Sequence, residues 1–406
     1  MTPHLTPRRE RWLLFTLAGI QFTHILDFMI MMPLGPQFTA LFGISNAQFG
    51  LLVSAYTLSA GLSGLMAATY IDRFSRKRLL LVMYALFGLA TMACGLAPDY
   101  VWLMVARVAA GLFGGVLSAL SQTIVADVVP FERRGRAMSV VMTSFSVSTV
   151  AGVPLGLFLA AHLSWHAPFF GIALLVGVLS LGAWKTLPRL DAHLHHPERT
   201  GVWRGIRQVL AEVNHLKAFG VSGLMMFASF TVIPYITIYL QSNAGMQAAE
   251  VPWVYLCGGV VTLLSAGYFG RLTDRLGKVR VFQRLALAAV LPLMATTLSQ
   301  GLPLWGLLAI STSFFTVMSG RMIPGMAMVS SAVEPRLRGT FMTLNSAMQS
   351  AAMGLAALVA GLIIGRDDLG QLTLYWAAGL LGVVASVLSA WLAGRLRLHG
   401  APAASA

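Results

Sequence analysis

The residue with the most distinctive chemistry in this sequence is Asp27, a carboxylate inside an apolar stretch that runs from about Trp12 to Leu34. This stretch is long enough to cross a lipid bilayer, because a spanning helix needs about 20 predominantly apolar residues. An ionised side chain within the hydrocarbon is costly unless it is paired or takes up a proton. Asp27 is therefore a candidate proton carrier.

A second intramembrane charge, Arg107, reaches the same depth as Asp27. Asp27 lies about 15 residues into its helix and Arg107 about eight residues into a helix of opposite direction, so both fall roughly 6 Å to the same side of the midplane at about 1.5 Å per residue. We expect the two side chains to pair. The pair is either a switch, in which a carboxylate separated from Arg107 takes up a proton, or a static contact that fixes helix packing.

His24 precedes Asp27 by three residues and therefore shares its helical face. It either relays the proton of Asp27 or hydrogen-bonds its carboxylate, or else its ring is satisfied by a backbone carbonyl. The sequence leaves these roles open.

The composition identifies the environment of these charges. Hydrophobic residues make up 57% of the chain and charged residues 10%, and the mean hydropathy is +0.76, which is typical of a polytopic membrane protein. The net charge of +14 comes from short basic clusters between apolar stretches, which indicates membrane orientation and argues against a nucleic-acid partner. Cys94 and Cys257 lie in apolar stretches, so no disulfide framework is expected.

Twelve apolar stretches of spanning length divide the chain. Because so many segments without strand-like alternation can satisfy their backbone groups in lipid only as helices, we predict an all-α polytopic membrane protein. The expected transmembrane helices cover residues 12–34, 47–70, 79–97, 100–125, 136–160, 166–187, 217–241, 251–271, 281–300, 303–326, 340–364 and 371–394.

Lys and Arg are strongly biased to one side of this topology. With the amino terminus in the cytoplasm, all but three of the 28 basic residues fall in the tails or in cytoplasmic connections. The exceptions are Arg366 on the opposite side, and Arg107 and Arg321 inside expected helices. The positive-inside rule therefore predicts that both termini are cytoplasmic.

The chain is predicted to consist of two pseudo-symmetric six-helix halves, residues 1–187 and 217–406, joined by a charged cytoplasmic linker over residues 188–216. The three histidines of the linker are expected to be solvated, and no metal site is expected. The halves repeat, since Asp274 follows Asp72 by 202 residues. Parallel duplication of six-helix halves is a transporter plan.

The repeated connections resemble a family signature. The segment from Gly270 to Lys278 is similar to the pattern G-x-x-x-D-R-x-G-R-[KR] of the major facilitator superfamily. The first copy, around Asp72, keeps the charges but has Ala68 and Ser75 where the signature has glycine. The resemblance implies twelve helices that alternate access to a central site.

Two further motifs resemble one branch of this superfamily. Arg107 followed by Gly111 is similar to its R-x-x-x-G motif, and the run that contains Gly152, Pro154 and Gly156 is similar to the antiporter motif of sugar-efflux and arabinose-efflux-like members. With Asp27, they indicate the drug:proton antiporter branch with twelve helices. Pro154 and the small residues are expected to bend the fifth helix and let it approach a neighbour closely.

The signature connections are expected to form a conformational latch. Asp72 can accept hydrogen bonds from the first amides of the eleventh helix, and Arg76 can pair with Asp127 at the end of the fourth helix. The residues assigned to the latch are Asp72, Arg73, Arg76, Asp127, Asp274 and Arg275.

A substrate cavity is expected where polar and flexible thioether side chains share helical faces with the charges. Arg321 has no acid at its depth, so it binds an anionic group of the substrate, snorkels toward the interface, or contacts helix carbonyls. The residues assigned to the cavity are Thr23, Met31, Tyr56, Met104, Tyr235, Arg321, Asn345 and Gln349, of which the polar ones are equally explained by interhelical hydrogen bonds.

The sequence thus predicts a secondary active transporter rather than an enzyme, because no acids, cysteines or zinc-spaced histidines cluster in the membrane. We expect a monomer in a bacterial cytoplasmic (inner) membrane that exports small amphipathic or apolar compounds, in multidrug fashion, in exchange for protons. It would need no cofactor other than the proton gradient, and its partners would be substrate, protons and the lipid bilayer. The alternative is uptake by proton symport or facilitated diffusion on the same fold.

Overall fold

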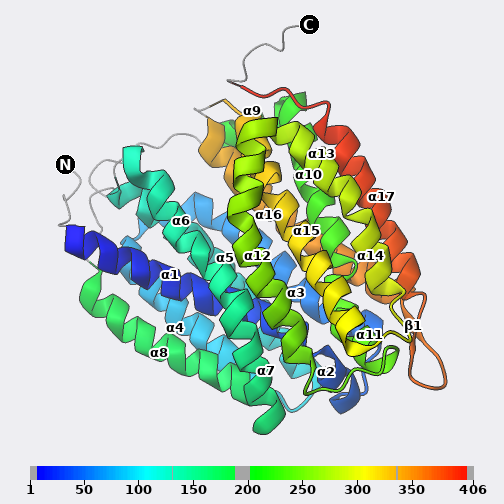
Figure 1. Cartoon of the computed structure of the whole chain (residues 1–406). Coiled ribbons are helices and arrows are strands. Elements are labelled where there is room, and N and C mark those ends of the chain that lie inside the picture. The colour runs from blue at the N-terminus through cyan, green and yellow to red at the C-terminus, as the bar shows by residue number, and fades with distance from the viewer. Residues whose placement is uncertain (1–6, 130, 188–201, 335–336, 400–406) are drawn as a thin grey trace, which may run out of the picture. The chain divides into compact units, whose positions relative to one another are not determined.

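The computed structural model describes residues 7–129, 131–187, 202–334 and 337–399. Within these ranges a few helical side chains are also outside the description, that of Asp72 among them. Among the described residues, twelve helical segments are long and apolar enough to cross a membrane, which confirms the predicted all-α polytopic architecture. Figure 1 shows the order of the helices along the chain.

The chain divides into two compact units. Unit 1 comprises Met1–Ile44 and Ala55–Arg199, and unit 2 comprises Ser45–Ser54 and Thr200–Ala406. The helix α3 therefore contributes its first turns to unit 2 and the remainder to unit 1. The linker predicted for residues 188–216 lies partly outside the described residues, which resume with the helix α9.

Unit 1 is built from helices alone in the part of the chain that the structure describes. The helices α1 and α8 pack together, as do α4 with α5 and α8, and α1 with α6. The elements are α1 (Pro7–Ile30), α2 (Gly35–Leu41), α3 (Asn46–Tyr70), η1 (Ile71–Arg73), α4 (Arg76–Gly95), α5 (Tyr100–Val128), α6 (Phe131–Val147), the π-helical η2 (Ser148–Gly152), α7 (Val153–His162) and α8 (Ala167–Thr186).

Unit 2 adds one short hairpin to its helices. The main packing pairs are α12 with α15, α10 with α16 and α17, and α13 with α15. The elements are α9 (Val202–Ala211), α10 (Val213–Phe230), η4 (Ile233–Tyr235), α11 (Ile236–Ser242), α12 (Val251–Leu276), α13 (Lys278–Ala288), α14 (Val290–Thr297), α15 (Leu304–Ser331), α16 (Arg338–Ile363), β1 (Gly365–Arg366), β2 (Leu372–Thr373) and α17 (Tyr375–Ala393).

The hairpin corrects the predicted start of the last transmembrane helix. Residues 371–373 were expected to be helical, but Leu372 pairs with Arg366 in an antiparallel ladder. The amide of Asn243 holds this strand from the side, because its Nδ2 donates to the Leu372 carbonyl at 2.9 Å and its Oδ1 accepts from the Leu372 N–H at 2.8 Å. The helix α17 therefore begins only at Tyr375.

Several spans predicted as continuous helices are interrupted. The first span breaks at the turn 31–34 before α2, and the seventh breaks after Phe230, with Pro33 and Pro234 at the interruptions. Proline lacks the N–H that would continue the helical ladder, so both breaks have a local cause. In lipid, such breaks are tolerated where neighbouring groups satisfy the freed backbone.

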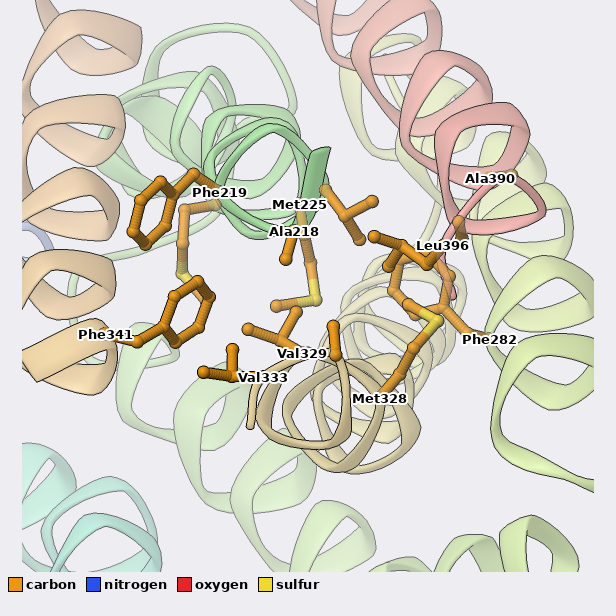
Figure 2. Packing of buried hydrophobic residues seen from close by; sticks show 14 of the residues in the cluster. Ala218, Phe219, Met225, Phe282, Met328, Val329, Val333, Phe341, Ala390 and Leu396 are labelled. Carbon is orange, nitrogen blue, oxygen red and sulfur yellow. The ribbon is translucent and has the colours of Figure 1, made fainter. Parts of the chain in front are cut away.

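The interior of unit 2 contains a tightly packed apolar cluster at one end of its helices (Figure 2). Phe219 of α10 stacks on Phe341 of α16, with ring centroids 4.5 Å apart and an interplanar angle of 7°. Phe282 of α13 and Met328 of α15 are also fully buried in this cluster. These contacts fix α10, α13, α15 and α16 against one another.

Candidate functional site

Asp27 and Arg107 form an ion pair in the interior of unit 1. The Nη1 of Arg107 donates to Oδ2 of Asp27 at 2.8 Å, and the two side chains are 1% and 0% exposed. The predicted contact is therefore present. Burial deprives both charges of hydration, and only their mutual attraction offsets that cost, so loss of either partner leaves an uncompensated charge.

Arg107 also supports the end of the helix that carries Asp27. The same Nη1 lies 3.3 Å from the main-chain carbonyl of Asp27, three residues before α1 ends at Ile30. The last carbonyls of a helix have no partner within the helix, so a cation at this end is stabilising. The guanidinium further lies over the ring of Tyr56, with Cζ 4.3 Å from the centroid.

The position of Arg107 depends on how closely α5 approaches α3. Asp99 caps α5 by accepting the Trp102 N–H at 2.8 Å, which fixes where this helix starts. A Cβ at Gly111 would meet the Tyr56 carbonyl and the Ser59 hydroxyl. The R-x-x-x-G spacing thus places Tyr56 against the arginine, because only glycine permits this approach.

His24 makes neither of the hydrogen bonds predicted for it. Both ring nitrogens are buried without a hydrogen-bond partner among the described residues, and so is Oδ1 of Asp27. The ring lies between aromatic neighbours, with its centroid 6.1 Å from those of Tyr56 and Phe87. One carboxylate oxygen of Asp27 thus makes no hydrogen bond within the described chain, which is unusual for a buried group.

Two residues of α4 at this site were not predicted. Thr91 lies beside the carboxylate of Asp27, and Cys94 lies beside the guanidinium of Arg107. Their three-residue spacing puts both on one helical face. Nothing in the sequence distinguishes them, because small polar residues recur throughout the apolar stretches.

The motif of Gly152, Pro154 and Gly156, in the fifth transmembrane span, packs against α1 on both sides of Asp27. The π-helical turn η2 interrupts the span just before Pro154, and a Cβ at Gly152 or Gly156 would meet Leu26 or Ile30. The predicted close approach is present, and the π-helical turn lies where the bend is expected. Such π-turns inside α-helices frequently occur at functional sites.

The remaining cavity residues of unit 1 differ in their surroundings. Thr23 is fully buried and shares a 3.0 Å hydrogen bond with the hydroxyl of Tyr84, so it joins α1 to α4. Met31 is also buried, in the turn after α1, whereas Met104 is half-buried.

Arg321 in unit 2 is fully buried and bonded to hydroxyl and carbonyl oxygens. It donates to the Ser386 hydroxyl at 2.9 Å and to both the Met225 carbonyl and the Ser229 hydroxyl at 2.8 Å. This arrangement matches the predicted carbonyl contact and excludes snorkelling, since the side chain is 0% exposed. The serine partners were not predicted.

The arrangement in unit 2 parallels that in unit 1. Ser229 follows Asp27 by 202 residues, the spacing that also relates Asp72 and Asp274. In each unit an arginine from a later helix contacts the last turns of an interrupted helix, Arg107 on α1 and Arg321 on α10. This repeat could have identified Ser229 from the sequence.

The other cavity residues of unit 2 are packed within it. Tyr235 donates to the Ala357 carbonyl at 2.7 Å, and Gln349 donates to the Ser222 hydroxyl at 2.6 Å. Asn345 is fully buried, and neither atom of its amide has a hydrogen-bond partner in the described chain. Of these three side chains, that of Asn345 is the one that makes no hydrogen bond within the described chain.

The latch residues are described only in part. The Nε of Arg76 donates to Oδ2 of Asp127 at 3.1 Å, so the predicted pair between the start of α4 and the end of α5 is present. Arg73, Asp274 and Arg275 are exposed. The side chain of Asp72 lies outside the described residues. The contact predicted between Asp72 and the eleventh transmembrane span, which is α16, is therefore outside the description too.

The twelve spans, the interrupted helices and the buried ion pair define a multi-pass helical membrane protein of the transporter type. The sequence matches the model of the Major Facilitator Superfamily over residues 17–357 and 218–403. The chain therefore belongs to this superfamily, whose members are membrane transporters and not enzymes.

Curated relatives come from Bacillus subtilis (strain 168). The uncharacterized MFS-type transporter YbcL is 24% identical over 392 residues, which cover 94% of this chain and 95% of that protein. The uncharacterized MFS-type transporter YtbD is 25% identical over 346 residues, 84% of this chain and 85% of that protein. Together with the twelve spans, these bacterial relatives indicate a multi-pass protein of a bacterial inner membrane.

Solved structures share the fold. A bacterial homologue of the human lysosomal transporter Spinster, in an inward-facing and occupied conformation, superimposes with a TM-score of 0.75 at 17% identity, covering 98% of this chain and 100% of the other. A D-xylose-proton symporter gives a TM-score of 0.75 at 18% identity over 95% of this chain and 97% of the other. At these identities the likeness concerns the fold alone.

Proposed function

We propose that this protein is a proton-coupled secondary transporter that exports small amphipathic or apolar compounds by alternating access, within the twelve-helix drug:proton antiporter branch. The observation that carries the proposal is the buried pair of Asp27 and Arg107. A charged pair inside the membrane is costly to maintain, and ionisable residues in such positions mark ion or proton pathways. The proposed halves are residues 1–187 and 217–406, joined by the linker over residues 188–216.

The contacts of Asp27 support a role as the proton carrier. Its Oδ2 has Arg107 as donor, whereas its Oδ1 has no hydrogen-bond partner among the described residues. A proton can therefore bind at Oδ1 without first displacing the arginine. Once the carboxyl is neutral, its attraction to Arg107 falls, and Arg107 then holds the end of α1 mainly through the main-chain carbonyl of Asp27.

The motif in η2 and α7 supports coupling between protonation of Asp27 and movement of α1. Gly152 and Gly156 pack on residues that flank Asp27, and the Ser148 hydroxyl donates to the Phe22 carbonyl at 3.1 Å. A change at the end of α1 is thereby transmitted to η2 and α7, because the two segments are in close contact. The export direction rests on the resemblance of this motif to that of antiporters.

We further propose that Asn345, whose amide makes no hydrogen bond within the described chain, contacts substrate. His24 would affect the proton affinity of Asp27, because it lies one helical turn away. Arg76 and Asp127 would belong to a latch at the cytoplasmic end. Both termini would be cytoplasmic, as the distribution of basic residues predicts. The protein would act as a monomer and use the proton gradient without a bound cofactor. Nucleic acid would not be a partner.

The test is transport by purified protein in liposomes with a defined pH gradient. A chemically mixed panel of radiolabelled amphipathic cations, neutral aromatic compounds and sugars is offered at both gradient directions. Proton antiport predicts that an acidic lumen drives accumulation of a substrate into the vesicles through protein of either orientation. Accumulation driven by an acidic exterior would instead establish symport, and transport independent of the gradient would establish facilitated diffusion.

A further inference from the structure

Unit 2 contains a basic groove between α13 and α17, next to the apolar cluster of Figure 2, with which it shares Ala390. The groove has a volume of about 450 Å³ and is lined by Arg280, Arg284 and Leu287 from α13 and by Val387 and Trp391 from α17. Neighbouring Phe282 points away from it into the cluster. The groove therefore lies on the face that the apolar core leaves free.

The floor of the groove is fixed by a hydrogen bond between the two helices. The Nε2 of Gln283 donates to the Ala390 carbonyl at 3.0 Å. A Cβ at Gly394 would meet the same amide, so the helices approach closely beneath the groove. The groove is thus a formed feature of unit 2 and does not depend on the position of unit 1.

Charge and hydrophobicity are ordered along the groove. Arg280 and Arg284 lie four residues apart near the start of α13, so both point to one side, and Leu287 lies one turn further into the span. On α17, which ends beside them, Val387 precedes Trp391, over whose ring the guanidinium of Arg395 lies with Cζ 3.7 Å from the centroid. One end of the groove is therefore cationic and the other apolar.

The arginines of the groove lack a counter-ion within the described chain. The ion pairs found there involve neither Arg280 nor Arg284, and no acidic residue lines the groove. Both side chains are exposed, and Leu287 and Trp391 are 54% and 53% exposed on a face of a membrane-spanning unit. Two adjacent guanidinium groups suit a phosphate, and the apolar end suits hydrocarbon.

We propose that this groove binds an anionic phospholipid, with the headgroup phosphate between Arg280 and Arg284 and an acyl chain along Leu287, Val387 and Trp391. Basic pockets between transmembrane helices at the membrane surface bind anionic headgroups in this way. With the predicted orientation, the lipid belongs to the cytoplasmic leaflet. The site is independent of the proposed substrate and of proton coupling.

The test is lipid binding by the full-length protein in uncharged detergent, titrated with dioleoyl-phosphatidylglycerol and followed by native mass spectrometry. Arg280→Gln with Arg284→Gln should weaken binding on the order of thirtyfold, since each arginine contributes a few-fold or more to anionic lipid attraction. Arg204→Gln with Arg271→Gln, exposed arginines of unit 2 outside the groove, removes the same charge and should leave binding unchanged. If the first pair does not fold, Arg284→Gln alone should weaken binding about fivefold.

Three results would overturn the proposal. An equal loss in both double variants would mean diffuse attraction to the basic surface. Equal binding of dioleoyl-phosphatidylcholine would mean that the arginines do not select the charge. Competition by inorganic phosphate as strong as that by the lipid would mean an anion site without a place for the acyl chain.

Discussion

The buried pair makes a specific prediction about stability. In Arg107→Gln, the carboxylate of Asp27 loses the donor to Oδ2, and its Oδ1 has no partner in the described chain to replace it. Removing one member of a buried pair costs about 3–5 kcal/mol, because the remaining charge is left uncompensated. We therefore expect Arg107→Gln to lower the free energy of unfolding by about this amount.

Asp27→Asn should cost less. Arg107 retains the main-chain carbonyl of residue 27 at 3.3 Å and the ring of Tyr56 at 4.3 Å, so its charge keeps two favourable contacts. We expect a loss of about 1–3 kcal/mol, the range for a hydrogen bond to a charged group. The free energy of unfolding that the double variant loses should be about 1–3 kcal/mol smaller than the sum of the two single losses, which is the coupling typical of residues in contact.

The assay is equilibrium unfolding of the four proteins in mixed micelles, with far-ultraviolet circular dichroism as the readout. Arg76 and Asp127 provide a matched pair in the same unit, since Asp127 is 37% exposed and its contact is 3.1 Å long. Their coupling should be smaller, about 1 kcal/mol or less, because solvent reaches the Asp127 carboxylate although Arg76 is only 3% exposed. Additive losses at Asp27 and Arg107, or a larger loss for Asp27→Asn than for Arg107→Gln, would refute the reasoning.

Two further predictions concern unit 2. In Gly50→Ala the new Cβ meets the Ala357 carbonyl, which is backbone and cannot move aside, so the start of α3 should shift away from α16 at a cost of about 1–3 kcal/mol. Spin labels on α3 and α16 should report a longer distance between the two helices. The control Gly267→Ala, whose Cβ meets nothing within 4 Å, should leave that distance unchanged. Arg321→Met should change the free energy of unfolding by less than about 1.5 kcal/mol, because methionine keeps a similar side-chain volume. The Ser386 hydroxyl also keeps its hydrogen bond to the Ala286 carbonyl, at 2.8 Å. Arg321→Ala should cost about 2–5 kcal/mol through the cavity it leaves, and equal losses for the two variants in thermal unfolding would show that the charge itself is required.

Much of the fold follows from the sequence because lipid imposes a strong constraint. Apolar stretches of spanning length with satisfied backbones can only be helices, so the twelve spans were predictable. The contact between Asp27 and Arg107 was predictable because charges are rare in the membrane and helical rise converts sequence position into depth. The contact of Arg76 with Asp127 followed from their position at the ends of adjacent helices.

Other features of the site carried no comparable signal. Arg321 contacts the hydroxyls of Ser229 and Ser386; the repeat marks the position of Ser229, but nothing marks Ser386, because serines occur in many spans. Whether His24 would find a partner depended on its side-chain direction and on Gly114, whose missing Cβ leaves room for the ring. The π-turn before Pro154 was foreseen only as a bend, because proline shows where a helix is disturbed and not how.

The central claim, that Asp27 carries the coupled proton, is tested most directly by Asp27→Asn in proteoliposomes. The amide resembles the protonated acid, so the variant should exchange labelled for unlabelled substrate across the membrane but should not accumulate substrate when a pH gradient is imposed. Asp368→Asn, an exposed acid of the hairpin connection, provides a matched control that should retain both activities. Accumulation by Asp27→Asn at the wild-type level under the same gradient would contradict the account.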